Sequence, residues 1–144
     1  TTKRLYKRVM VKSISKLKKE LDKYFSLFIR LRDADDLGFV ECITSGRFYH
    51  YKNLHAGHFM SRKSHSTRWD EVNVQPQSAA DNLFGQGEQY KFGKALDQKF
   101  GEGTSEKLQQ KSREIQKFSR VDYEEKISYY KSLVEKLKKE KGIE

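Results

Sequence analysis

The chain of 144 residues has one cysteine, one proline and no long run of apolar side chains. Because Cys42 stands alone, an internal disulfide is excluded, and a reducing, cytoplasmic setting fits the composition. No stretch approaches the roughly 20 apolar residues that a membrane-spanning helix needs, so we expect no membrane partner. The basic N-terminal residues are not followed by an apolar segment, which argues against a secretory signal.

The composition predicts one domain with a modest core. Hydrophobic residues make up 35% of the chain and charged residues another 35%. A chain of this length typically forms a single domain, and here much of it should be solvated helix.

Negative charge is scarce in the first quarter of the chain. Residues 1–32 hold eleven Lys or Arg against Glu20 and Asp22, within a net charge of +10 for the whole sequence. Such a segment favours a polyanionic partner, and binding to nucleic acid would then weaken steeply with salt. The alternative is a solvated helix face that only aids solubility.

Apolar spacing predicts the helices. Steps of three and four residues between Met10 and Leu31 predict an amphipathic helix over 8–32, ended near Gly38. We expect a helix from near Ser78, which follows Pro76, and another over 105–118. A last helix over 119–140 should open with a capping box at Ser119, and its apolar seam should pair with the first helix or with a second subunit.

Short extended segments lie between these helices. Residues 39–43 and 47–51 read as strands joined by a turn at 44–46, and a further extended piece is expected over 53–60. Residues 61–72 are polar and basic and predict a loop around Trp69. The three glycines between residues 83 and 94 weaken the helical pattern there.

The residues that suggest chemistry occur in the order His58, Asn73 and Asn82. Phosphodiester hydrolysis needs a base for water and a cation for the leaving oxygen. His58 is the candidate base, Asn82 a candidate ligand for a divalent cation, and Asn73 a residue that holds the loop or the His58 ring. His55 is a second candidate ligand or a DNA contact. Oxygen ligands favour Mg²⁺, with Mn²⁺ as a substitute.

Each of these residues also has a plainer interpretation. A lone histidine is more often a surface or core residue than a catalyst, and the asparagines read separately as a turn former and a polar residue at a helix end. Only the order and spacing of these residues distinguish them from residues without a catalytic role.

Several ordered segments of the chain resemble a known family. They are Tyr24–Asp35, Cys42–Gly46, Ala56–Arg62, Thr67–Glu71, Asn73–Asn82 and Gly87–Tyr90. Together they resemble the phage NinG/Rap recombination proteins, a branch of the HNH (ββα-metal) endonuclease superfamily. The likeness spans residues 22–100, which is more than half of the chain.

The resemblance implies an α+β fold with a small ββα-metal core and a short hairpin, flanked by helices. The corresponding division is a basic helix over 1–33, a nuclease core over 34–100 and a helical extension over 101–144. The implied activity is metal-dependent cleavage of branched DNA such as Holliday junctions and D-loops, by a homodimer, in the cytoplasm of a phage-infected host.

The chain departs from the family at its zinc knuckle. The family places C-x-x-C pairs at positions 42–45 and 78–81, where this chain has Cys42, Ser45, Ser78 and Asp81. Serine is a poor zinc ligand, so we expect no structural zinc, although Cys42, Asp81 and a nearby histidine are a weak alternative set. Packing of Phe39, Phe48, Tyr49 and Trp69 would then replace the zinc in a natural relative; deliberate alteration of the knuckle is the other explanation.

The candidate DNA contacts fall into two groups. Arg62, Lys63 and Arg68 follow His58 in sequence and should flank the site as phosphate contacts. The first helix adds Lys12, Lys16, Lys19 and Lys23 for a second arm of a branched substrate, with Arg30 and Arg32 between that helix and the core.

Three functions therefore compete. The first is a Mg²⁺-dependent endonuclease for branched DNA. The second is a branched-DNA-binding protein that keeps the nuclease fold without cleavage, which the missing cysteines and His55 favour. The third is a basic helical scaffold with no nucleic-acid role.

Overall fold

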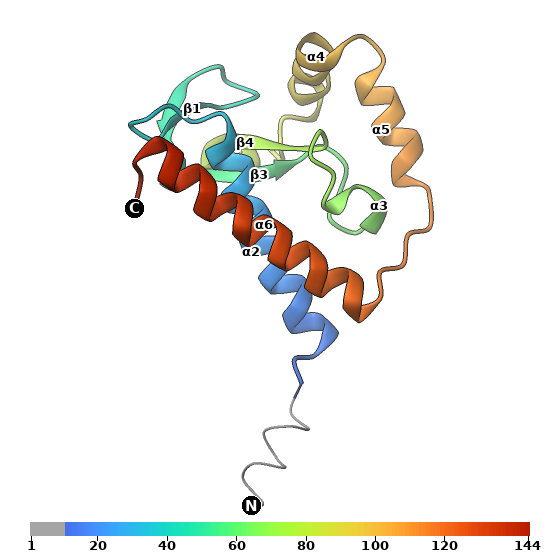
Figure 1. Cartoon of the computed structure of the whole chain (residues 1–144). Helices are drawn as coiled ribbons and strands as arrows, with labels where there is room; N and C mark the ends of the chain where they lie inside the picture. The colour runs from blue at the N-terminus through green and yellow to red at the C-terminus, as the bar shows by residue number, and fades with distance from the viewer. Residues whose placement is uncertain (1–10) are drawn as a thin grey trace, which may run out of the picture.

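A computed structural model describes residues 11–144 as an α+β fold, as the sequence predicts (Figure 1). The elements in chain order are α2 (Ile14–Arg32), β1 (Phe39–Glu41), β2 (Phe48–His50), η1 (Tyr51–Asn53), β3 (Leu54–His58), α3 (His65–Arg68), β4 (Val74–Ser78), η2 (Ala80–Phe84), α4 (Gln89–Phe100), α5 (Thr104–Ser112) and α6 (Arg120–Lys141). None of the helices in this part of the chain is long and apolar enough to cross a membrane.

Helix α2 begins later than its apolar spacing predicts. Ser13 caps it, and its side chain accepts a hydrogen bond from the Lys16 N–H at 3.2 Å. This cap supplies a partner for one of the free N–H groups at a helix start. Residues 11–13 are therefore not helical, and the expected start at residue 8 lies outside the described residues, as does Met10.

A glycine turn leads from α2 into the first hairpin. Gly38 has a φ of +87°, and a Cβ there would lie 2.7 Å from the His50 ring. Only glycine fits such a position without strain. The turn sets β1 against β2 in antiparallel register, with Val40 opposite Tyr49.

The second hairpin corrects one sequence prediction. Strand β4 pairs antiparallel with β3, with Gly57 opposite Gln75, and it contains Pro76, where the sequence predicted the approach to a helix. Proline is tolerated in strands that pair on one side only. The carbonyl of Pro76 accepts a hydrogen bond from the Ile43 N–H at 2.9 Å, which joins the two hairpins.

The helix expected near Ser78 begins two residues later and is a π-helix, η2. Because it follows β4 directly, β3, β4 and η2 form a strand–strand–helix unit. The predicted loop over 61–72 joins β3 to β4 and contains the single helical turn α3.

Helices α2 and α6 lie side by side (Figure 1) and run in the same direction. Arg120, at the start of α6, donates to the Lys12 carbonyl, and Lys141, near its end, donates to the Ala34 carbonyl, both at 2.6 Å. The apolar residues that were predicted to form one side of the last helix thus pack on α2. Ile127, Tyr130 and Val134 of α6 are buried in the main core, and the capping box at Ser119 is present as predicted.

Helices α4 and α5 pack around Phe59, the residue that directly follows β3. Phe59, Phe92, Leu96 and Leu108 form a second, smaller hydrophobic cluster. Helix α5 ends at Ser112, six residues short of its predicted end. Leu108 is its buried anchor, whereas Ile115 is 89% exposed, so no apolar contact extends the helix.

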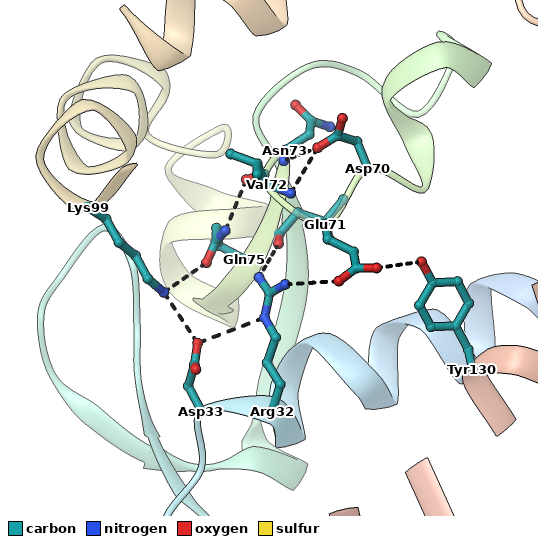
Figure 2. Close-up of polar contacts among 10 residues, drawn as sticks. Arg32, Asp33, Asp70, Glu71, Val72, Asn73, Gln75, Lys99 and Tyr130 are labelled. Atoms are coloured by element: carbon teal, nitrogen blue, oxygen red, sulfur yellow. Dashed lines mark hydrogen bonds and ion pairs between the residues drawn. The ribbon is translucent and has the colours of Figure 1, made fainter. Parts of the chain in front are cut away.

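A polar network ties these elements together (Figure 2). Arg32 of α2 pairs with Glu71 at 4.0 Å, and the Tyr130 hydroxyl of α6 donates to Glu71 at 3.1 Å. Lys99 of α4 pairs with Asp33 at 3.3 Å. Arg32 also donates to the Val74 carbonyl at 3.3 Å and Lys99 to the Gln75 side chain at 3.4 Å, so the network holds α2, α4 and α6 around β4.

Candidate functional site

The strand–strand–helix unit brings together three of the predicted site residues. His55 and His58 lie on β3 and Asn82 on η2, and all three line one cavity of about 450 Å³, here called the histidine cavity. Its opposite wall is the face of α2 that carries Asp22, Phe25, Ser26 and Arg30, and Arg62 also borders it. His58 and Asn82 thus border the same cavity, and that they share a cation there stays a prediction.

The His58 ring is oriented by the loop that follows β3. Its Nε2 lies 2.8 Å from the Arg68 carbonyl oxygen, which can only accept, so Nε2 carries the hydrogen and Nδ1 keeps a lone pair in the neutral ring. Burial and the nearby Arg62 charge lower the pKa of His58 below its ordinary 6.5, against the opposing effect of the Arg68 carbonyl. The ring is therefore neutral at pH 7, as a general base requires.

Asn73 holds the loop and does not contact the His58 ring. Its side chain is fully buried; its Oδ1 accepts from the Met60 N–H at 2.7 Å, and its Nδ2 donates to the carbonyls of Met60 and Thr67. Asp70 in turn accepts from the Asn73 N–H at 3.0 Å (Figure 2). Asn73 thus fixes segment 59–73, which carries the Arg68 carbonyl.

His55 and Asn82 are direct neighbours. The Asn82 Nδ2 lies 3.0 Å from the His55 Nδ1, which joins η2 to β3 at the cavity. An amide oxygen and an imidazole nitrogen are both possible cation ligands. Among residues 11–144, no three His, Cys, Asp or Glu side chains group into a metal site. Because the Asn82 Nδ2 can only donate, its hydrogen bond uses the lone pair of the His55 Nδ1 and leaves the Asn82 Oδ1 as the unshared acceptor of the pair.

The four knuckle positions, 42, 45, 78 and 81, do come together, around Thr44. The Thr44 hydroxyl donates to Asp81 at 2.6 Å and lies 3.5 Å from the Cys42 sulfur. The Ser78 N–H donates to that sulfur at 3.2 Å. Burial alone would raise the pKa of Cys42, but hydrogen bonds from Ser45, Thr44 and Ser78 outweigh it and lower the pKa.

Hydrogen bonds therefore link the four positions at which the resemblance implies a zinc knuckle, and the expected aromatic replacement is only partly present. Trp69 is buried and Tyr49 is half-buried. Phe39 and Phe48 are 42% and 66% exposed, so the prediction that they pack in place of the metal is wrong.

Sequence reasoning missed Asp22, the acidic residue of α2 that borders the histidine cavity. Its carboxylate accepts from Arg68 through two nitrogens, at 2.6 and 3.2 Å, from Arg62 at 2.6 Å and from the Trp69 indole at 2.9 Å. Burial alone would raise the pKa of Asp22, but the Arg68 and Arg62 contacts outweigh it and lower the pKa. Its signal in the sequence was that it is one of only two acids in residues 1–32 and stands next to Leu21 of the apolar stripe.

The predicted arginine contacts differ in how free they are. Arg62 and Arg68 both pair with Asp22, but the Arg62 side chain is 58% exposed at the cavity border, whereas Arg68 is 15% exposed. Arg30 lines the cavity and donates to the Tyr51 carbonyl at 2.9 Å. Arg32 is 18% exposed and bonded to internal partners, which leaves Arg62 and Arg30 as the arginines facing the cavity.

The predicted lysines are exposed. Lys16, Lys19 and Lys23 lie on the solvent side of α2, and Lys63 lies on the loop after β3. Lys12 is also exposed but pairs with Glu20 at 2.7 Å. The α2 lysines therefore remain available to a polyanion.

Comparison with known proteins identifies the chain by family. The model of the family described as Bacteriophage Lambda NinG protein matches residues 2–140, and the chain belongs to this family. The family is related to phage recombination. Neither a curated protein nor a solved structure matches the chain.

Proposed function

We propose that this protein is a metal-dependent endonuclease for branched recombination intermediates such as Holliday junctions. The observation that carries the proposal is the convergence of His55, His58 and Asn82 on one cavity bordered by Arg30 and Arg62. A neutral imidazole, a possible cation site and two guanidinium groups are the components that phosphodiester hydrolysis needs. The order β3, β4, η2 is also that expected of a ββα-metal core.

Each residue has one role in this proposal. His58 takes a proton from the attacking water, and its hydrogen bond to the Arg68 carbonyl keeps the ring oriented. Asn82 and His55 hold Mg²⁺ or Mn²⁺, which when bound would stabilise negative charge on the phosphate and the leaving oxygen. Arg62 and Arg30 bind the phosphate, and Asn73 fixes the loop.

A cleavage assay tests the proposal. The substrate is a labelled four-way junction with Mg²⁺ or Mn²⁺, compared with a linear duplex of the same sequence and with a chelator. We expect metal-dependent cuts near the branch that fall at least 100-fold in His58→Ala, on the scale of a lost general base. His50→Ala is the matched control, since His50 lies on β2 and does not line the cavity. Equal, metal-independent background from all three proteins would eliminate the enzyme.

The second candidate is a branched-DNA-binding protein without cleavage. It is favoured by the mutual hydrogen bond of His55 and Asn82 and by the engagement of Asp22 with arginines, which leaves the cavity without a free carboxylate ligand. Junction binding that persists in wild type and His58→Ala, with no cleavage by either, would select this candidate.

A further inference from the structure

Three large apolar side chains are exposed beside the histidine cavity. Leu83 is 61%, Phe84 86% and Tyr90 78% exposed, within eight residues of one another; together they are called the apolar patch. They lie on η2 and at the start of α4, which the short segment 85–88 joins, and large apolar side chains exposed this close together in the chain favour an interaction surface. Asn82, which lines the cavity, directly precedes Leu83, so the patch begins where the candidate site ends.

The backbone beneath the patch is held in place. The Gly85 N–H donates to the Ala80 carbonyl, and the Gly87 N–H to the Asp81 carbonyl, both at 2.8 Å. The Gln77 side chain of β4 donates to the Gly87 carbonyl at 2.8 Å, and the Gln89 side chain donates to the Phe59 carbonyl at 2.6 Å. The exposure of the patch is therefore imposed by the fold.

The same segment contains unfavourable backbone conformations. Gln86 and Glu88, neither of them glycine, have φ values of +53° and +48° on either side of Gly87 at +81°. Such residues cost free energy and persist where the surroundings impose them, often at binding sites. Helix η2 itself is a π-helix, a form that frequently occurs at functional sites.

An exposed cation beside an exposed aromatic ring favours nucleic acid as the partner of the patch. Lys91 and Lys94 are exposed on α4, and the Lys94 Nζ lies 5.3 Å from the centre of the Tyr90 ring. Glu88 pairs with Lys91 at 4.0 Å and Asp81 accepts from the Thr44 hydroxyl, so Lys94 is the cation that lies beside an aromatic ring of the patch. Aromatic rings interleaved with cations are the surface on which unpaired nucleobases stack.

We propose that Leu83, Phe84 and Tyr90 contact unstacked bases at a DNA branch point and thereby give the protein its preference for branched over linear DNA. Bases in a continuous duplex are stacked on each other and offer no free face to the patch, whereas those at a branch are opened at a lower cost. The inference rests on the proposed function in that the protein binds branched DNA and that the histidine cavity holds the phosphate next to the branch.

Binding measured without metal tests the inference. Phe84→Ser and Tyr90→Ser are compared with wild type on a four-way junction and on the matched linear duplex, with a chelator present so that cleavage cannot interfere. We expect each variant to lose about tenfold in affinity for the junction and to keep its affinity for the duplex. Ile115→Ser is the control, because Ile115 is equally exposed but lies between α5 and α6.

Each other outcome overturns the inference. These are an unchanged junction affinity, an equal loss on both DNAs, or a wild type that binds both DNAs equally. Lower self-association of Phe84→Ser by sedimentation, with DNA binding intact, would assign the patch to a second copy instead. Thermal unfolding confirms that the variants fold. A failure of metal-dependent cleavage affects only the proposed function, since this measurement involves none.

Discussion

At the residue scale, opposing influences set the charge of His58. Burial and Arg62 lower its pKa, while the Arg68 carbonyl and Asp22 raise it, with a net value below 6.5. A base works only when deprotonated, so kcat/KM should fall with acid through a midpoint below pH 6.5 and stay level above pH 7. Arg62→Gln removes a lowering charge and should move the midpoint upward, whereas Lys52→Gln, on exposed η1, should not. A wild-type midpoint above 6.5 would contradict this assignment.

Asn73 provides a second prediction at this scale. Its side chain makes three hydrogen bonds while fully buried, and alanine would leave the partner groups on Met60 and Thr67 unsatisfied. We expect Asn73→Ala to lower the free energy of unfolding in urea by roughly 3 kcal/mol. Asn53→Ala, at an exposed position, should change it little. A small effect at Asn73 would mean that the loop holds its shape by other contacts.

At the element scale, Asp22 joins α2 to segment 59–73. Three side chains of that segment, Arg62, Arg68 and Trp69, converge on its carboxylate. The segment in turn orients His58 through the Arg68 carbonyl. The helix that the sequence presents as a basic arm is therefore also a wall of the candidate site.

Asp22→Asn tests this connection through the pH dependence of stability. The pKa of Asp22 lies below its ordinary 3.8, so its charge stabilises the fold at neutral pH, and this contribution is lost as the pH falls through the lowered pKa. The variant should be less stable than wild type at pH 7, by about 2 kcal/mol, and the difference should shrink below pH 4. Urea unfolding at several pH values measures it.

The single tryptophan reports on the same contact. Its indole N–H donates to Asp22, so the indole proton signal should shift and exchange faster in Asp22→Asn. Asp97→Asn serves as the control, because Asp97 caps α5 and is remote from Trp69. An unchanged stability difference from pH 7 to pH 3 would show that the charge of Asp22 is not what stabilises the loop.

At the scale of the whole molecule, positive charge is concentrated on α2. Lys16, Lys19 and Lys23 are exposed there. If each contacts a phosphate, changing all three to glutamine should reduce the slope of log K against log salt by about 2–3, at roughly 0.9 per contact. Titration with a four-way junction at several salt concentrations measures the slope.

The control for this measurement removes the same charge elsewhere. Lys107, Lys117 and Lys139 are also exposed, but on or near α5 and α6. Their change to glutamine should alter the slope less. Equal slopes for wild type and the α2 variant would assign the α2 lysines to solvation, the plainer interpretation of this face.

Local patterns in the sequence predicted what short-range physics controls. The stripe between Leu17 and Leu31 and the capping box at Ser119 predicted α2 and α6, since helix periodicity and caps depend on residues three or four positions apart. The strand over Val74–Ser78 was missed because Pro76 argues against a strand unless the pairing partner is known. The motif order also predicted that His58 and Asn82 would share a cavity.

The sequence by itself therefore determined the apolar stripes of α2 and α6, the capping box at Ser119, the excess of positive charge and the candidate residues of the site. Only the tertiary structure decided that α6 packs on α2, that Asp22 holds Arg62 and Arg68, and that Phe39 and Phe48 remain exposed. It also decided that hydrogen bonds around Thr44 occupy the knuckle positions. The physical reason is that these contacts join residues far apart in the chain, and burial and pairing at such distances depend on how all elements pack at once.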